Sequence, residues 1–138
     1  MAPTSPLDHC WYAVATADSI GPHPTSIQIR GIAYVIWRGA DHRLVAARDR
    51  CPHREARLSL GTVEHGCLQC PYHGWTFGEG GRCVDIPSSG VGAAIPPTAH
   101  LDVLPVAEQY GLVWFCPAEP RHPIPRLQVE EDDAFTRL

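Results

Sequence analysis

Two short segments of the chain carry side chains that commonly bind metals. Cys51 and His53 form one pair with a single residue between them, and Cys70 and His73 form a second pair with two residues between them. Sixteen residues, 54–69, separate the first histidine from the second cysteine. Thiolates and imidazoles are frequent metal ligands, so two close pairs predict a metal centre with two cysteine and two histidine ligands.

The mixed composition of each pair bears on which metal is bound. Structural zinc sites also use Cys and His ligands, but their close pairs are usually of like type, Cys with Cys and His with His. In this chain each pair joins one Cys to one His. A two-iron cluster with two thiolates on one iron and two imidazoles on the other needs such a mixed set. The spacing favours the two-iron cluster, with a structural zinc module that mediates interactions as the alternative.

The residues around the two pairs resemble a known family. CPHR at 51–54 and CPYHGW at 70–75 resemble the Rieske [2Fe–2S] signature in its oxygenase branch. WYAVA at 11–15, GRCVDIP at 81–87 and YGLVWF at 110–115 are similar to segments of the N-terminal Rieske domain of ring-hydroxylating and demethylating oxygenases. The resemblance extends over roughly residues 11–125.

This resemblance implies one [2Fe–2S] cluster per chain and a role in one-electron transfer. Cys51 and Cys70 would bind one iron as thiolates, and His53 and His73 would bind the other. The function implied first is that of the electron-input domain of a Rieske non-haem iron oxygenase. A reductase or ferredoxin would be the electron donor, and a mononuclear-iron oxygenase domain the acceptor. The alternative is a stand-alone Rieske ferredoxin that carries electrons between a reductase and an oxygenase.

The resemblance also bears on the redox potential. High-potential respiratory Rieske proteins carry an extra Cys in each cluster loop and a Ser soon after the second His. Here Arg54, Glu55 and Ala56 follow the first His, and Trp75 stands where that Ser would be. We therefore expect a potential at the low end of the Rieske range, which runs roughly from −150 to +300 mV. Because imidazole nitrogens that do not bind iron can carry protons, we also expect the potential to depend on pH.

No residue of this sequence is assigned a catalytic role. The mononuclear iron of the oxygenases that the chain resembles is held by two His and one carboxylate. Only His100 and His122 follow His73, and neither lies in a paired-His motif with a nearby carboxylate. We therefore expect an electron-transfer component without an O₂-activating site of its own.

The pattern along the chain predicts a mainly β fold, a small antiparallel β-sandwich or barrel with the metal ligands on two loops at one end. The resemblance implies that this fold is of the Rieske type and that the two loops bind the cluster. No stretch of ten residues has the periodicity of an α-helix. Breaker-rich residues 87–99 predict a surface loop. We expect a flexible N-terminus at 1–8, the Rieske domain at 9–120 and an extension at 121–138, Pro-rich and then acidic. The expected strands lie within residues 9–15, 26–30, 33–38, 43–49, 62–69 (two short strands with a break at Gly66), 82–86, 101–107 and 110–116. Two hairpins are expected, one from 33–38 to 43–49, whose second strand leads to Cys51, and a closing one from 101–107 to 110–116.

Composition limits the remaining classes of function. The formal net charge of −4 and pI near 6.0 give no nucleic-acid footprint. No apolar run approaches the ~20 residues that a membrane span needs, and no signal peptide is evident, so we expect a cytoplasmic protein. The other four cysteines are expected to be inert packing residues and the other six histidines to lie in turns or at the surface. Arginines near the first pair are either solvated or form a docking patch for an acidic partner: Arg48, Arg50, Arg54 and Arg57.

Overall fold

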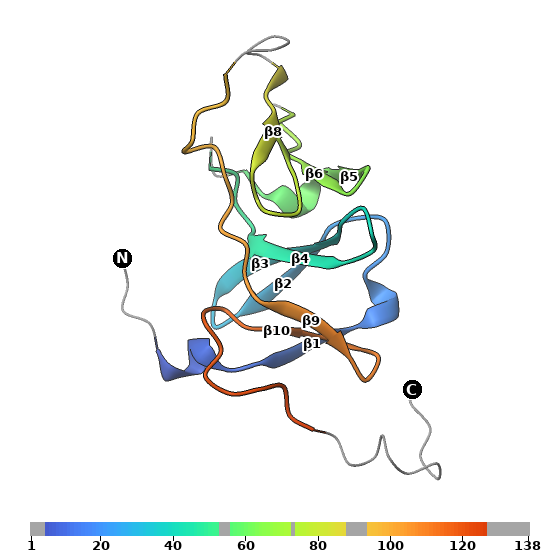
Figure 1. The fold of residues 1–138 in the computed structure, drawn as a ribbon, viewed down its shortest axis with the longest axis vertical. Coiled ribbons are helices and arrows are strands. Elements are labelled where there is room, and N and C mark those ends of the chain that lie inside the picture. The colour runs from blue at the N-terminus through green and yellow to red at the C-terminus, as the bar shows by residue number, and fades with distance from the viewer. Residues whose placement is uncertain (1–4, 53–55, 73, 88–93, 127–138) are drawn as a thin grey trace. The chain divides into compact units, whose positions relative to one another are not determined.

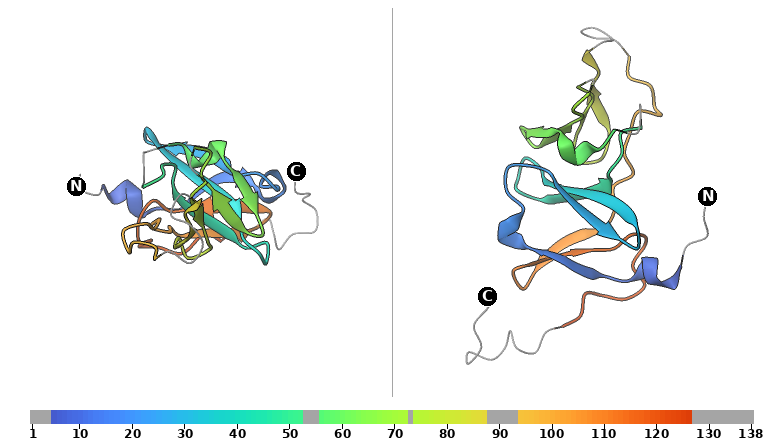
Figure 2. Two further views of the ribbon diagram at one scale, coloured as in Figure 1. Left: turned by 90° about the horizontal axis from the view of Figure 1, so that it is seen from above. Right: turned by 180° about the vertical axis from the view of Figure 1, so that it is seen from behind.

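The computed structural model describes residues 5–52, 56–72, 74–87 and 94–126. The chain divides into two compact units, one made of Met1–Ser19 with Leu104–Leu138 and the other of Ile20–Val103. Figures 1 and 2 show the ribbon from three directions. Within these described residues, the pairings between strands are antiparallel and form three sheets, which confirms the mainly β prediction. The predicted domain limits at 8/9 and 120/121 are not tested by this division and stay predictions.

The first unit contains a three-stranded sheet in the order β1-β10-β9. Its strands are β1 (Tyr12–Thr16), β9 (Val106–Gln109) and β10 (Leu112–Phe115). The expected closing hairpin is therefore present as β9–β10, and it also pairs with the first strand of the chain. The flanking turns are η1 (Pro6–His9), which Ser5 caps, and η2 (Ala17–Ser19). The sequence predicted a flexible segment at 1–8 and a strand from His9, but His9 ends η1 and β1 begins at Tyr12.

The second unit begins with a three-stranded meander in the order β2-β3-β4. These strands are β2 (Thr25–Ile29), β3 (Ile32–Arg38) and β4 (Leu44–Arg48). The apolar run of β3 explains its central position, because a strand with a neighbour on each edge is the one most enclosed. Its residues Tyr34–Trp37 are all buried. The β3–β4 pairing confirms the predicted hairpin whose second strand leads to Cys51.

A four-stranded sheet in sequence order completes the second unit. It contains β5 (Thr62–Glu64), β6 (Cys67–Gln69), β7 (Thr76–Phe77) and β8 (Cys83–Asp85). Glu64 pairs with Cys67, so His65 and Gly66 form a two-residue turn, and both have positive φ, 53° and 79°. Two positive φ angles fit a type I′ hairpin turn, which explains the break that the sequence predicted at Gly66.

Between β4 and β5 the chain forms the short 3₁₀ turn η3 (Leu58–Leu60). Both Figure 1 and the rear view in Figure 2 show η3 between the meander and the four-stranded sheet. Over the part of the chain described here, all helical segments are short 3₁₀ turns and none could cross a membrane. The predicted absence of long helices therefore holds for these residues.

The core of the second unit lies between its two sheets. It is built from residues of both sheets, η3 and the 95–101 segment, and its largest members are Trp37, Phe77, Leu58 and Leu68. Ala99 is buried in this core and Ile95 packs against it. The prediction that all of 87–99 is a surface loop was therefore wrong at these two residues, although Pro96, Pro97 and Thr98 are exposed. Residues 88–93 lie outside the described part.

Candidate metal centre

Both candidate cysteine ligands lie just after strands of the second unit. β4 ends at Arg48, three residues before Cys51, and β6 ends at Gln69, immediately before Cys70. The Cys51 and Cys70 residues are 1% and 4% exposed. Strands fix the backbone on the N-terminal side of each thiol, so the position of each sulfur is set by the sheets and not by a mobile linker.

The two cysteines begin loops that are closed in the same way. The N–H of Cys51 donates to the carbonyl of Ala56 at 2.8 Å, and the N–H of Cys70 donates to the carbonyl of Trp75 at 2.8 Å. We call residues 51–56 the first ligand loop and residues 70–75 the second ligand loop. The same backbone hydrogen bond, from each Cys to the fifth residue after it, therefore gives the two thiols equivalent places in their loops.

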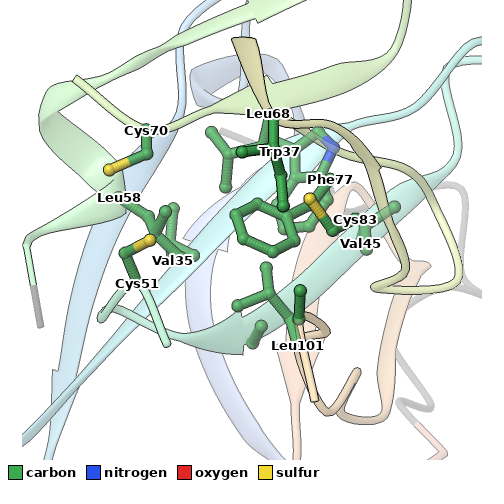
Figure 3. Close-up of a cluster of buried hydrophobic side chains, with 13 residues drawn as sticks. Val35, Trp37, Val45, Cys51, Leu58, Leu68, Cys70, Phe77, Cys83 and Leu101 are labelled. Atoms are coloured by element: carbon green, nitrogen blue, oxygen red, sulfur yellow. The ribbon is translucent and has the colours of Figure 1, made fainter. Parts of the chain in front are cut away.

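The two thiols belong to one apolar cluster. Cys51 and Cys70 are members of the core of the second unit, together with Leu58 and Leu68. Figure 3 shows both sulfur atoms on the same side of this cluster, near Leu58 and away from Phe77. A shell of apolar side chains behind two thiols keeps water from one side of any metal that they bind, and this lowers the local dielectric constant.

The second ligand loop is the connection of a β-hairpin. Gln69 pairs with Thr76 and Leu68 pairs with Phe77, so the ladder of β6 and β7 runs up to the loop. Inside the loop Gly74 has a φ of +72°, and its N–H donates to the carbonyl of Cys70 at 3.2 Å. A positive φ favours glycine, and this gives a physical reason for the Gly after the second His.

The first ligand loop has a different base, made of polar side chains. The carboxylate of Asp49 accepts a hydrogen bond from the N–H of Ser59 at 2.8 Å and from its hydroxyl at 2.6 Å. It also accepts from the hydroxyl of Ser26 at 3.2 Å and from the guanidinium of Arg57 at 3.3 Å. We call this group the Asp49 network. Sequence analysis missed it, although an acidic residue at the end of a predicted strand and two positions before a ligand was a usable signal.

The comparison with known proteins decides the class of this centre. Residues 10–105 match the Rieske [2Fe–2S] domain family. The chain belongs to this family. The resemblance found in the sequence is therefore confirmed, and the cofactor of the domain is a [2Fe–2S] cluster.

The relatives of this Rieske domain are oxygenases. The chain is 34% identical over 136 residues to aminopyrrolnitrin oxygenase of Pseudomonas fluorescens, which covers 94% of this chain and 38% of that protein. It is 40% identical over 114 residues to methylxanthine N1-demethylase of Pseudomonas putida, covering 78% and 32%. A crystal structure of dicamba monooxygenase superimposes with a TM-score of 0.82 at 34% identity, over 93% of this chain and 40% of that one. The Rieske domain described here thus spans less than half the length of each of these proteins.

The described ligand residues fit a cluster of this type. A [2Fe–2S] centre of the Rieske class needs two thiolates for one iron, and the second unit brings two buried thiols to one side of its core. The two imidazoles of the predicted set, His53 and His73, lie outside the described residues. Among the residues that are described, no group of three or more His, Cys, Asp or Glu side chains could hold a metal ion. The four-residue ligand set therefore stays a prediction of the sequence, supported at its two thiols.

The remaining cysteines of the Rieske domain differ in burial. None of the six cysteines forms a disulfide. Cys83 and Cys116 are buried, as expected for packing residues, whereas Cys10 and Cys67 are partly exposed. Burial raises the pKa of the Cys83 thiol above its ordinary value of 9.0, and burial likewise raises the pKa of Cys116. Both buried thiols are therefore protonated and unreactive near neutral pH.

Other residues named from the sequence are placed more simply. Tyr72 of the second ligand loop is 70% exposed, so it is not a core aromatic, whereas Trp75 packs against the core. Arg57 belongs to the Asp49 network and is not a free member of an arginine patch. Arg54 lies outside the described residues, so the docking patch stays a prediction. The six histidines without a ligand role are exposed or partly exposed, as expected: His9, His23, His42, His65, His100 and His122.

Proposed function

We propose that this Rieske domain is the electron-input domain of a Rieske non-haem iron oxygenase. The observation that carries the proposal is the pair of buried thiols, each at the start of a loop closed by the same backbone hydrogen bond. The proposal is also supported by the similar proteins, which include an oxygenase and a demethylase. A reductase or ferredoxin as donor and a mononuclear-iron domain as acceptor are parts of this proposal.

The residues of the chain would hold the cluster in distinct roles. Cys51 and Cys70 would supply deprotonated sulfurs to one iron, and His53 and His73 would supply ring nitrogens to the other. The bound cluster supplies reversible one-electron chemistry. The apolar core behind the thiols excludes water on that side, and the strands that precede each loop hold the ligands at fixed positions. Electron transfer is fast when the ligand geometry changes little between oxidation states. A rigid sheet framework keeps that change small.

The first test is the identity and the ligation of the metal. The purified chain should contain two irons and two sulfides and should take up one electron per chain in a reductive titration. Cys51→Ala and Cys70→Ala should abolish the cluster, whereas Cys67→Ala, a partly exposed thiol three residues before Cys70, should retain it. A colourless protein with one zinc per chain would establish the zinc module instead. Equal loss of iron in all three variants would contradict the ligand assignment.

The second test concerns the role in electron transfer. The cluster-loaded domain should be reduced by a flavin-dependent reductase supplied with NADH, and the coding sequence beyond Leu138 distinguishes its context. Continuation into a mononuclear-iron domain supports the electron-input role, and a stop codon supports the stand-alone ferredoxin. We also propose a cytoplasmic location, for which the support is that the six cysteines form no disulfide, because thiols remain reduced there.

A further inference from the structure

The two ligand loops differ in what holds their ends together. The second ligand loop connects β6 to β7, and the backbone ladder of those strands reaches its first and last residues. The first ligand loop follows β4, which pairs with β3 among the described residues, and it leads into η3. Within that part of the chain, no strand pairing joins the residues before the first loop to the residues after it. Apart from the Cys51–Ala56 hydrogen bond, the separation of its two ends therefore depends on interactions other than a strand ladder.

The Asp49 network occupies the place of that missing ladder. Asp49 lies two residues before Cys51, and Ser59 lies three residues after Ala56, where the inner hydrogen bond of the loop ends. Both oxygens of the Asp49 carboxylate are used, because Oδ1 accepts from the N–H of Ser59 at 2.8 Å and Oδ2 from its hydroxyl at 2.6 Å. Two hydrogen bonds thus connect the entry of the first ligand loop directly to its exit.

The other partners of Asp49 tie the loop to the framework. Its Oδ2 accepts from the hydroxyl of Ser26 on β2 at 3.2 Å, and Arg57 donates to both Ser26, at 2.9 Å, and Asp49, at 3.3 Å. The backbone N–H of Asp49 donates to the carbonyl of Ala33 on β3 at 3.1 Å. The network therefore joins β2, β3 and η3 at the residue from which the first loop departs.

The burial of Asp49 makes these contacts effective. Its side chain is 0% exposed, whereas that of Arg57 is 55% exposed. A buried carboxylate that loses its donors cannot replace them with water, so the geometry is held strongly. The partly exposed arginine supplies a positive charge without having to be buried itself. Next to it, Leu58 is fully buried beside Cys51 in the core, so any shift of η3 is transmitted to the thiol.

We infer that Asp49 is a positioning residue for the cluster: it clamps the two ends of the first ligand loop and so sets the place of Cys51. This inference rests on the proposed role of Cys51 as a ligand. The clamp acts only on the first loop, because the β6–β7 ladder performs the same task for the second. Residues that orient metal ligands from the outer shell typically change metal affinity or activity by about 10- to 100-fold when they are replaced.

The test compares cluster release and spectra in four variants of the cluster-loaded protein. Asp49→Ala removes all side-chain acceptors, Asp49→Asn keeps one carbonyl oxygen for the Ser59 N–H, and Ser59→Ala removes one donor. Asp41→Asn, in the exposed β3–β4 turn, makes the same change of charge as Asp49→Asn without touching the network. The rate of iron transfer to a ferrous chelator is measured well below the unfolding temperature, and EPR g values and the midpoint potential are measured in the fraction that remains loaded.

We expect Asp49→Ala to release iron roughly 10- to 100-fold faster than the wild type. Asp49→Asn and Ser59→Ala should give smaller increases, and Asp41→Asn should match the wild type. The g values should shift in the Asp49 variants, because a purely stabilising residue would leave the spectrum of the loaded protein unchanged.

Two results would overturn the inference, and a third would remove its premise. Wild-type release rates and g values in the Asp49 variants, with only a lower unfolding temperature, would make Asp49 a structural residue. If Asp49→Ala does not fold, unchanged release in both Asp49→Asn and Ser59→Ala leads to the same conclusion. A wild-type chain that binds no [2Fe–2S] cluster would instead refute the proposed function, so the two failures are distinguishable.

Discussion

The two leucines of η3 offer a matched test of how the core supports the thiols. Leu58 and Leu60 lie two residues apart in the same turn, but Leu58 is 0% exposed and Leu60 is 65% exposed. Replacing a fully buried leucine by alanine typically costs about 2–5 kcal/mol, from lost apolar burial and from the cavity that remains. That is a large part of the roughly 5–15 kcal/mol by which small domains are stable. We therefore expect Leu58→Ala to destabilise the domain strongly.

The assay is thermal unfolding of the cluster-loaded protein, followed by circular dichroism and by the visible absorption of the cluster. For a chain of this length a loss of 1 kcal/mol lowers the midpoint by roughly 3–5 °C, so Leu58→Ala should lower it by at least about 6 °C. The control Leu60→Ala should change stability by less than about 0.5 kcal/mol, which is about 2 °C. Figure 3 places Leu58 near the two sulfurs, so bleaching of the cluster should also begin earlier in Leu58→Ala.

The comparison of the two variants makes this reasoning refutable. Equal shifts for Leu58→Ala and Leu60→Ala would mean that the burial of Leu58 does not contribute to stability. A large shift of the unfolding midpoint without earlier bleaching would separate the core from the metal centre, and the role of Leu58 beside the thiols would then be wrong.

Three further perturbations test other parts of the second unit. Gly66→Ala should lower the free energy of unfolding by more than about 1 kcal/mol, because φ at Gly66 is +79° and the added Cβ would meet the backbone of Ala40. The control Gly21→Ala, where the added Cβ has open space, should leave the thermal unfolding midpoint nearly unchanged. Trp37→Phe removes the indole donor to the carbonyl of Gly66, 3.1 Å away, and should cost about 1–3 kcal/mol in the same assay; an unchanged midpoint would contradict this. Burial raises the pKa of the Cys83 thiol above its ordinary value of 9.0. The contribution of the protonated thiol to stability is therefore complete below that value and is lost as pH rises from it through the higher pKa of the folded state. Between pH 8 and 10.5 the unfolding midpoint should fall less in Cys83→Ala than in wild type.

Much of the fold follows from local sequence patterns. The apolar run of β3 and the turn after it predict the β3–β4 hairpin, and the type I′ turn at His65 and Gly66 follows from a polar residue and a glycine between two short strands. The spacing of the Cys and His pairs predicts the ligand set, because metal sites combine few residue types in short motifs, and the structure brings its two cysteines into one core. These features depend on neighbours in sequence, which is the information that a single chain provides.

Features that depend on distant residues were not predicted. The pairing of β1 with β10 joins opposite ends of the chain, and no local pattern specifies which strands become neighbours. The Asp49 network likewise joins Asp49 to serines and an arginine from two other segments of the chain. Ala99 is buried although it lies among prolines and polar residues, because its environment is set by the sheets around it and not by its own neighbours in sequence. Long-range packing thus decided each of these positions.

The β1–β10 pairing has a consequence for the order in which the protein is made. The unit that carries both ligand loops is one continuous segment, Ile20–Val103. In the sequence, this segment comes after β1 and before β10, the two strands that pair with each other. During translation β1 emerges early but has no partner until β10 has also emerged. All residues of the thiol-bearing unit leave the ribosome before β10 does. Because contiguous units fold as the chain emerges, the ligand loops can form, and cluster insertion can begin, while the first strand is still waiting for the last.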